Sequence, residues 1–182
     1  MYYGLAYFPR IEHSGFHAFR KEYDPFTVFI PEHITFIYPV PETIDISKLE
    51  SHINRIIKAW RPYSIHFCET DLTKDHWLFL GAKEGKPEAI KLHDELYTGI
   101  LSEYLRKDLP YVPRLGLGLF SKEKYDTTNP TAELTLDYIK YTKARKKFEA
   151  LNFELHCTID NLTLLRINKD FTKFEKVLNF NL

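Results

Sequence analysis

The stretch PEHITFIY, residues 31–38, decides how this sequence is interpreted. Its apolar residues alternate with polar ones, and prolines stand on both sides of it, as they do where loops limit a strand. We therefore predict a β-strand over residues 33–38. Successive side chains of a strand point to opposite faces, so His33 and Thr35 share one face while the apolar residues between and after them share the other.

An imidazole beside a hydroxyl on one strand face suits a phosphate ligand. A histidine moves protons near neutral pH, and a threonine hydroxyl donates a hydrogen bond to a phosphate oxygen. The alternative is structural, namely a hydrogen-bonded strand histidine next to a threonine that favours β-structure. The tripeptide His-x-Thr alone does not decide between these roles, because this composition readily gives a chance match. The sequence has two such tripeptides, one at His33 and one at His156-Cys157-Thr158.

The patterns around this stretch extend along the whole chain. Proline positions and apolar spacing predict strands over residues 2–8, 63–70, 76–82, 114–120, 153–167 and 174–182. Helical spacing predicts helices over residues 16–23, 47–60, 87–105 and 131–149. Ser47 begins a capping box with Glu50, Pro87 suits a first helical position, and Thr131 is a further candidate cap.

The two halves of the sequence resemble one another weakly. In each half a proline precedes a short strand, which is followed by a helix and then by two strands. The segment SIHF, residues 64–67, also has a counterpart in ELHC, residues 154–157. With only two units this indicates an internal duplication and not a solenoid. A length of 182 residues suits one compact domain or two small lobes that share a core.

Composition excludes several classes of function. The formal net charge is zero, whereas proteins that bind duplex DNA are usually strongly basic. No apolar run reaches the length of a membrane span, and residues 2–8 are expected to form a strand and not a signal peptide. The cysteines, Cys68 and Cys157, lack metal-type spacing and indicate reduced thiols in a cytoplasmic setting. Aromatic residues make up 15% of the chain, which we attribute mainly to core packing.

Residues 31–36 resemble the first signature of the two-histidine (2H) phosphoesterases, a superfamily that includes the bacterial 2′-5′ RNA ligase-like proteins. The opening strand with Gly4, FRKEYDP at residues 19–25 and LYTGIL at residues 96–101 resemble phosphoesterase-like proteins of bacilli. The resemblance implies an α/β (α+β) fold over residues 1–182, in which two pseudo-symmetric lobes of antiparallel sheet, with flanking helices, surround a central cleft.

The same resemblance implies a chemistry. In that superfamily each lobe contributes one His-x-Thr motif to the cleft, and the two histidines act as general base and general acid on a 2′,3′-cyclic phosphate or a 2′-5′ phosphodiester. By this resemblance His33 is one of the two histidines and Thr35 binds the phosphate. The reaction requires no metal, and we expect no other cofactor.

The second signature of the superfamily is altered in this sequence. The matching segment is PRLGLG, residues 113–118, where Arg114 takes the place of the histidine and Gly116 that of the threonine. A guanidinium can hold a phosphate through two hydrogen bonds, but it keeps its proton at neutral pH and cannot replace histidine as a general acid. We therefore expect a phosphate site in which the two-histidine mechanism is weakened or absent.

Further residues belong to the predicted site as alternatives. Tyr38 and Tyr111 flank the two motif strands, where each either stacks on a base or packs in the core or rim. His156 and Thr158 would supply a replacement acid only if their strand faced the cleft, and a structural role is the alternative.

Two functions from different classes remain open. One is a metal-free phosphoesterase, and the other is a binding module that holds a phosphate-containing small molecule, a nucleotide or an RNA end without turnover. The intact His33 favours the enzyme, whereas Arg114 and Gly116 favour the module. Arg20 and Lys21 either line the mouth of the cleft or form a solvated basic pair. The sequence does not set the oligomeric state.

Overall fold

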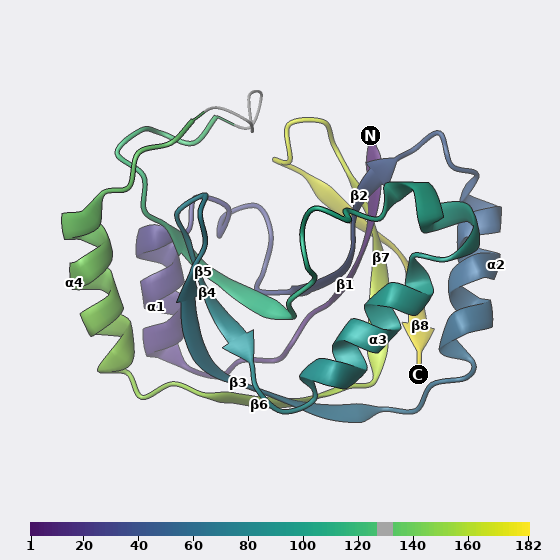
Figure 1. The fold of residues 1–182 in the computed structure, drawn as a ribbon, viewed down its shortest axis with the longest axis horizontal. Helices are drawn as coiled ribbons and strands as arrows, with labels where there is room; N and C mark the ends of the chain where they lie inside the picture. Colours follow the sequence, from purple (N-terminus) through teal and green to yellow (C-terminus); the bar gives the residue numbers. More distant parts are fainter. Residues whose placement is uncertain (127–132) are drawn as a thin grey trace.

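The computed structural model describes residues 1–126 and 133–182, which form two four-stranded antiparallel sheets and four α-helices (Figure 1). The first sheet has the strand order β2-β1-β7-β8 and consists of β1 (Tyr2–Tyr7), β2 (Ile34–Pro41), β7 (Asn161–Ile167) and β8 (Phe174–Asn181). The second has the order β5-β4-β3-β6 and consists of β3 (Tyr63–Leu72), β4 (Trp77–Ala82), β5 (Arg114–Leu119) and β6 (Leu155–Ile159). The predicted fold class, two lobes of antiparallel sheet, is confirmed.

The chain passes from the second sheet to the first through a single residue, Asp160. Since β6 ends at Ile159 and β7 begins at Asn161, the continuous strand predicted over residues 153–167 is wrong. The two strands have different surroundings. β6 is an edge strand with one exposed face, whereas residues 162–165 of the central strand β7 are all buried. A buried central strand carries a continuous run of apolar residues, whereas a half-exposed strand alternates apolar and polar residues. The change from the second pattern to the first marks the point at which the chain passes from one sheet to the other.

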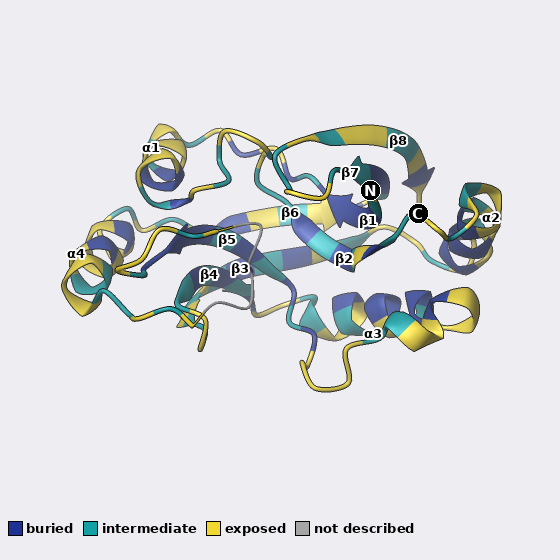
Figure 2. Ribbon diagram, turned by 90° about the horizontal axis from the view of Figure 1, so that it is seen from above, coloured by how far each residue is buried: buried dark blue, intermediate teal, exposed yellow. Residues whose placement is uncertain are grey.

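Three of the four α-helices pack at the two ends of the molecule, and α3 lies nearer its middle (Figures 1 and 2). α1 (Ser14–Tyr23) contacts β5 of the second sheet and lies beside α4 (Tyr138–Glu149). α2 (Ile46–Ile57) contacts β8 of the first sheet, and α3 (Lys86–Leu96) contacts β2. α1 therefore follows a strand of the first sheet but covers the second, and α3 does the reverse. These two crossings tie the sheets to each other.

The start of α2 differs from the prediction. Asp45 is the N-cap, and its carboxylate accepts a hydrogen bond from the backbone N–H of Lys48 at 3.0 Å. Ser47 lies inside the helix, so the predicted capping box is wrong. Aspartate and serine are similarly good N-caps, and the aspartate two residues earlier takes the role here.

Two later helices are shorter than predicted. The helix predicted over residues 87–105 ends at Leu96, and a separate 3₁₀ helix covers Gly99–Tyr104, because Gly99 adopts a φ of 53° that an α-helix does not contain. α4 begins only at Tyr138, after the N-cap Asp137. Thr131, the predicted cap, lies outside the described residues.

One hydrophobic cluster contains residues of both sheets and all four helices. Its largest fully buried side chains include five phenylalanines, Phe16, Phe19, Phe36, Phe67 and Phe120. A large part of the aromatic content therefore lies in the core, as predicted. Among the residues that the structure describes, no helix is long and apolar enough to cross a membrane.

Candidate functional site

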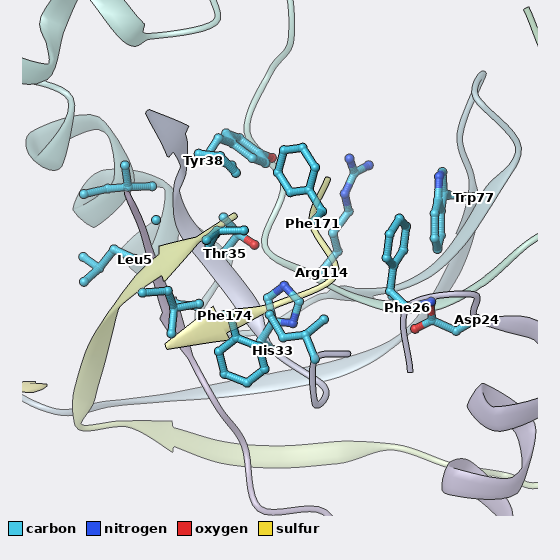
Figure 3. Close-up of a pocket in the computed structure, with 18 of the residues that line it drawn as sticks. Leu5, Asp24, Phe26, His33, Thr35, Tyr38, Trp77, Arg114, Phe171 and Phe174 are labelled. Atoms are coloured by element: carbon cyan, nitrogen blue, oxygen red, sulfur yellow. The ribbon is translucent and has the colours of Figure 1, made fainter. Parts of the chain in front are cut away.

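The two motif strands occupy equivalent places in the two sheets. β2 and β5 are each an edge strand, and they contact one another. Between them lies a cavity of about 360 Å³ (Figure 3). Five of the predicted site residues line this cavity, namely His33, Thr35, Tyr38, Arg114 and Gly116. The fold thus brings both motif segments, about 80 residues apart in the sequence, into one site.

His33 immediately precedes β2, and a main-chain hydrogen bond orients its ring. Nδ1 lies 2.9 Å from the carbonyl oxygen of Pro31. A carbonyl oxygen only accepts, so Nδ1 carries the proton and Nε2 of the neutral ring keeps a free lone pair. Burial lowers the pKa of His33, the hydrogen bond to Pro31 opposes this shift, and the charge of Arg20 lowers the pKa further. The ring is therefore neutral at pH 7, and Nε2 can accept a proton.

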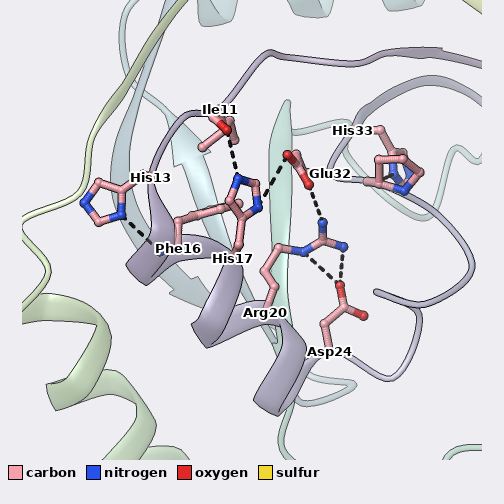
Figure 4. A network of polar contacts seen from close by, with 9 residues as sticks. Ile11, His13, Phe16, His17, Arg20, Asp24, Glu32 and His33 are labelled. Atoms are coloured by element: carbon pink, nitrogen blue, oxygen red, sulfur yellow. Dashed lines mark hydrogen bonds and ion pairs between the residues drawn. The ribbon is translucent and has the colours of Figure 1, made fainter.

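A buried ion-pair network lies beside His33 (Figure 4). The side chain of Arg20 is 4% exposed, and its guanidinium donates hydrogen bonds to Asp24 (Nε to Oδ2, 3.1 Å) and to Glu32 (Nη1 to Oε2, 3.0 Å). Arg20 also lines the cavity. The alternative in which Arg20 and Lys21 form a solvated basic pair is therefore wrong for Arg20, which is buried. Lys21 is exposed to solvent, as that alternative expected. Because two carboxylates already balance its charge, Arg20 supports the local structure more than it offers a positive charge to a ligand.

Side chains from other elements bind the free backbone groups of the edge strand β2. The Tyr111 hydroxyl donates to the carbonyl oxygen of Thr35, and Nδ1 of His93 donates to that of Phe36, both at 2.9 Å. The Tyr97 hydroxyl accepts a hydrogen bond from the backbone N–H of Tyr38, also at 2.9 Å. The rings of His93 and Tyr111 stack with centroids 3.9 Å apart. Tyr111 is thus buried behind the motif strand and positions it, while Tyr38 lines the cavity.

Arg114, at the start of β5, places a positive charge in the cavity. The guanidinium carbon of Arg114 lies 3.9 Å from the ring centroid of Phe79, a cation–π contact. Among residues 1–126 and 133–182, no carboxylate forms an ion pair with Arg114. Burial raises the pKa of the Tyr38 hydroxyl, and the charge of Arg114 opposes this rise. An unpaired guanidinium in a partly enclosed cavity is suited to an anion.

Gly116 leaves room where a threonine side chain would stand. The residue lies opposite Phe79 in the β4–β5 pair. A Cβ at position 116 would meet Cε1 of Phe79 at 3.9 Å, which is ordinary van der Waals contact. Packing therefore does not require glycine at position 116.

Aromatic side chains from distant segments form much of the cavity wall (Figure 3). They are Phe26, Tyr38, Trp77, Phe79, Tyr125, Phe171 and Phe174. Phe26 and Trp77 stack with centroids 5.8 Å apart, and Tyr125 meets Phe26 edge-on at 5.4 Å. Tyr38 is the member of this wall that was predicted as a candidate site residue, whereas the other aromatic residues of the wall were attributed to core packing. One signal was available, since Trp77 and Phe79 alternate in β4 with the buried aliphatic residues that face the core.

A protein-family model described as the 2′-5′ RNA ligase superfamily matches residues 8–171 of the chain. The chain belongs to the 2′-5′ RNA ligase superfamily. This agrees with the resemblance of residues 31–36 to the two-histidine phosphoesterases. Two relatives named "Putative phosphoesterase", from Bacillus licheniformis and Bacillus anthracis, are 26% and 28% identical to the chain over 119 and 120 residues. Each match covers 63% of this chain, and they cover 69% and 67% of the relatives.

Solved structures share the fold of this superfamily member. A protein of Thermus thermophilus superposes with a TM-score of 0.64 at 17% identity, with 100% of this chain and 98% of that chain covered. E. coli LigT complexed with 3′-AMP gives a TM-score of 0.58 at 14% identity, with 100% and 97% covered. At these identities the likeness shows a common fold.

The second His-x-Thr tripeptide of this 2′-5′ RNA ligase superfamily member lies outside the cavity. β6 pairs with β3 at the edge of the second sheet opposite to β5. His156 lies directly opposite His66, with ring centroids 3.8 Å apart, so the similar segments 64–67 and 154–157 are paired neighbours. His156 and Thr158 line a separate hollow on this face. The structure does not bring His156 to His33, as the role of replacement acid requires.

Proposed function

We propose that this chain binds the phosphate group of a nucleotide or an RNA end in the cavity between β2 and β5. The observation that carries the proposal is the convergence of His33, Thr35 and Arg114 on that cavity. The threonine hydroxyl and the guanidinium supply donors for phosphate oxygens. The aromatic wall beside them offers faces on which a base can stack.

The ligands of a structural relative support this proposal. E. coli LigT has been solved in complexes with 3′-AMP, ATP and NADP+. These three molecules share a phosphate group joined to a nucleoside. The zero net charge of the present chain fits such a short ligand better than a long duplex, whose binding depends on many phosphate contacts.

The reaction that the site supports best is hydrolysis of a 2′,3′-cyclic phosphate or a 2′-5′ phosphodiester. Nε2 of His33 takes a proton from a water molecule, the water oxygen attacks phosphorus, and the bond from phosphorus to the departing ribose oxygen breaks. That oxygen takes its proton from a solvent water molecule, and His33 returns its own proton to solvent. Arg114 stabilises the charge on the phosphoryl oxygens, but it does not protonate the departing oxygen. Since one general acid contributes about 10²–10⁴-fold to a rate, we expect a metal-free phosphoesterase of reduced or altered activity.

A second function is a binding module without turnover. The feature that favours it is the pair Arg114 and Gly116. Arg114 offers the ligand a positive charge but is no general acid, and Gly116 has no hydroxyl. Such a module would hold a nucleotide or an RNA end as tightly as the enzyme does, and it would release the ligand unchanged.

Turnover of 2′,3′-cyclic nucleotides by the purified protein separates these two functions. Three proteins are compared, the wild type, the His33→Ala variant and the double variant Arg114→His/Gly116→Thr. The enzyme predicts slow turnover by the wild type, loss of turnover with His33→Ala, and a gain of about 10²-fold or more in the double variant. The double variant restores an acid and a hydroxyl at a position where the added Cβ has ordinary contacts.

Calorimetric titration with 3′-AMP gives the matching measurement of binding. The binding module predicts no turnover by the wild type, a measurable affinity, and a loss of about tenfold or more with Arg114→Ala. The exposed Lys21→Ala variant serves as the control for loss of a positive charge near the site. Robust turnover that survives His33→Ala would show that the chemistry lies elsewhere, and a wild type that neither turns over nor binds nucleotides would refute both functions.

A further inference from the structure

Three side chains of metal-ligand type meet on the second sheet, away from the cavity. His66 of β3 lies directly opposite His156 of β6, and Glu154 immediately precedes β6. The His66 side chain is 13% exposed, that of Glu154 57% and that of His156 70%. One potential ligand atom from each residue lies within 4.8 Å of the other two. Two imidazoles and a carboxylate are thus gathered at a solvent-accessible place.

The distances within this cluster approach those of a four-coordinate zinc site. In a tetrahedral site, bonds of about 2.0–2.2 Å place neighbouring ligand atoms about 3.4 Å apart. Nε2 of His66 and Nε2 of His156 lie 2.9 Å and 3.9 Å from the same carboxylate oxygen of Glu154. The two rings are stacked with an interplanar angle of 12°, so one of them must turn before both nitrogens point at one ion. The exposed side chains of His156 and Glu154 have the freedom to do so.

We propose that His66, Glu154 and His156 form a binding site for a divalent transition-metal ion of the zinc class. Imidazole nitrogen suits zinc, copper and nickel, whereas magnesium and calcium prefer sites made of oxygen ligands. Three protein ligands leave a fourth position for water or for a group of another molecule.

Metal binding at this cluster displaces a proton. Without a metal, Nε2 of His66 donates a hydrogen bond to Glu154 and therefore carries the proton. A metal needs that nitrogen unprotonated, so the proton moves to Nδ1 or to solvent when the ion binds.

The backbone holds the ligands in place without help from a metal. Five consecutive cross-strand pairs, from Tyr63 with Ile159 to Phe67 with Leu155, fix the register in which the two histidines face each other. The ligands come from β3 and β6, so His66 and Glu154 are 88 residues apart, which explains why sequence spacing gave no metal signal. β6 and β5 are opposite edges of the sheet, so this site is independent of the nucleotide cavity.

The test is calorimetric titration of the untagged full chain with Zn²⁺ near pH 7.5. We expect one ion per chain, and at least about tenfold weaker binding with His156→Ala and with Glu154→Gln, since even changes to the neighbours of ligands cost 10–100-fold. His156 is exposed and the glutamine keeps the shape of Glu154, so both variants should fold. His17→Ala, which removes another exposed histidine outside the cluster, is the matched control and should bind like the wild type.

A thermal scan gives an independent readout from the same proteins. An ion that binds only the folded chain raises the melting temperature, so added Zn²⁺ should stabilise the wild type and the His17→Ala variant and shift the two cluster variants less. The proposal is overturned if the wild type binds no zinc, or if His156→Ala and Glu154→Gln bind it with the wild-type affinity.

Discussion

The protonation of the His33 ring is set by neighbours outside the tripeptide His33-Ile34-Thr35. The carbonyl oxygen of Pro31 selects which ring nitrogen keeps the proton, while burial and the charge of Arg20 hold the pKa of the imidazole below its ordinary value. Arg20 in turn depends on Asp24 and Glu32, which balance its charge inside the protein. A change at one of these neighbours should therefore alter His33 without touching it.

Replacement of Arg20 by methionine tests this dependence. The variant leaves Asp24 buried without its partner, so the free energy of unfolding should fall by about 3–5 kcal/mol. Loss of the positive charge should also raise the pKa of His33, which a proton NMR titration of the histidine ring measures. Lys21→Met is the control, because Lys21 is exposed and its loss should change neither quantity. An unchanged titration of His33 in a folded Arg20→Met protein would contradict the expectation.

Stability should depend on pH through His93. This side chain is 3% exposed, and burial lowers its pKa. Below the ordinary histidine pKa of about 6.5, the unfolded chain binds a proton that the folded chain does not, so the free energy of unfolding falls as the pH drops. Burial gives His33 a shift of the same sign.

Urea unfolding of the wild type near pH 7.5 and near pH 5.5 measures this effect. The difference between the two free energies should shrink in a His93→Asn variant, whose amide Nδ2 takes the place of the imidazole Nδ1 and can still donate to the carbonyl oxygen of Phe36. The same pH dependence in both proteins would show that His93 contributes nothing to it.

Strands were predicted more accurately than helix ends, for physical reasons. An alternating burial pattern repeats along a whole strand, so the bounds of β1, β3, β4 and β5 lie within two residues of the prediction. The start of a helix depends on which nearby side chain accepts a hydrogen bond from the first free backbone N–H groups. Asp45 and Asp137 take this role in α2 and α4, in place of the predicted serine and threonine caps. The break at Asp160, where the chain passes from one sheet to the other, also depends on tertiary contacts. β6 pairs with β3 and β7 pairs with β1, and both partners are distant in the sequence.

Two glycines of β5 give a matched test at the level of elements. A Cβ at Gly118 would lie 2.6 Å from Cβ of Tyr23 and 3.0 Å from its carbonyl oxygen, at the end of α1. Gly118→Ala should therefore push α1 away from the sheet and lower the free energy of unfolding by about 1–3 kcal/mol. Gly116→Ala, with its contact at 3.9 Å, should leave stability within about 0.5 kcal/mol of the wild type. Equal effects of the two substitutions in chemical denaturation would refute this account of how α1 packs on β5.

The whole molecule shows which part of a site a sequence can reveal. The motif segments were found because each is a short local pattern with its own alternation. Apart from Tyr38, the aromatic wall was not predicted, and neither was the His66–Glu154–His156 cluster, because their members come from strands and loops far apart in the chain. The two alternatives for Arg20 could not be separated from the sequence for the same reason, since its partner Glu32 lies 12 residues away along the chain.

The predicted single bilobal domain over residues 1–182 can be tested by calorimetry. The first sheet combines β1 and β2 with β7 and β8 from the other end of the chain, and one core joins both sheets. We therefore expect one unfolding transition, with equal calorimetric and van't Hoff enthalpies. Deletion of residues 161–182 removes two strands of the first sheet and should abolish that transition. Two resolved transitions in the intact chain would mean that the lobes unfold independently.

The stacking of Trp77 on Phe26 gives this protein an internal optical probe. The chain has two tryptophans, and Trp60 packs on Tyr63 and donates a hydrogen bond to Glu95, outside the cavity wall. A Trp60→Phe chain would therefore carry a single indole fluorophore at the ligand cavity. A base that stacks against that wall would quench or shift its emission, so collections of nucleotides can be screened in solution without labels, and occupancy can be followed even for ligands that are never turned over.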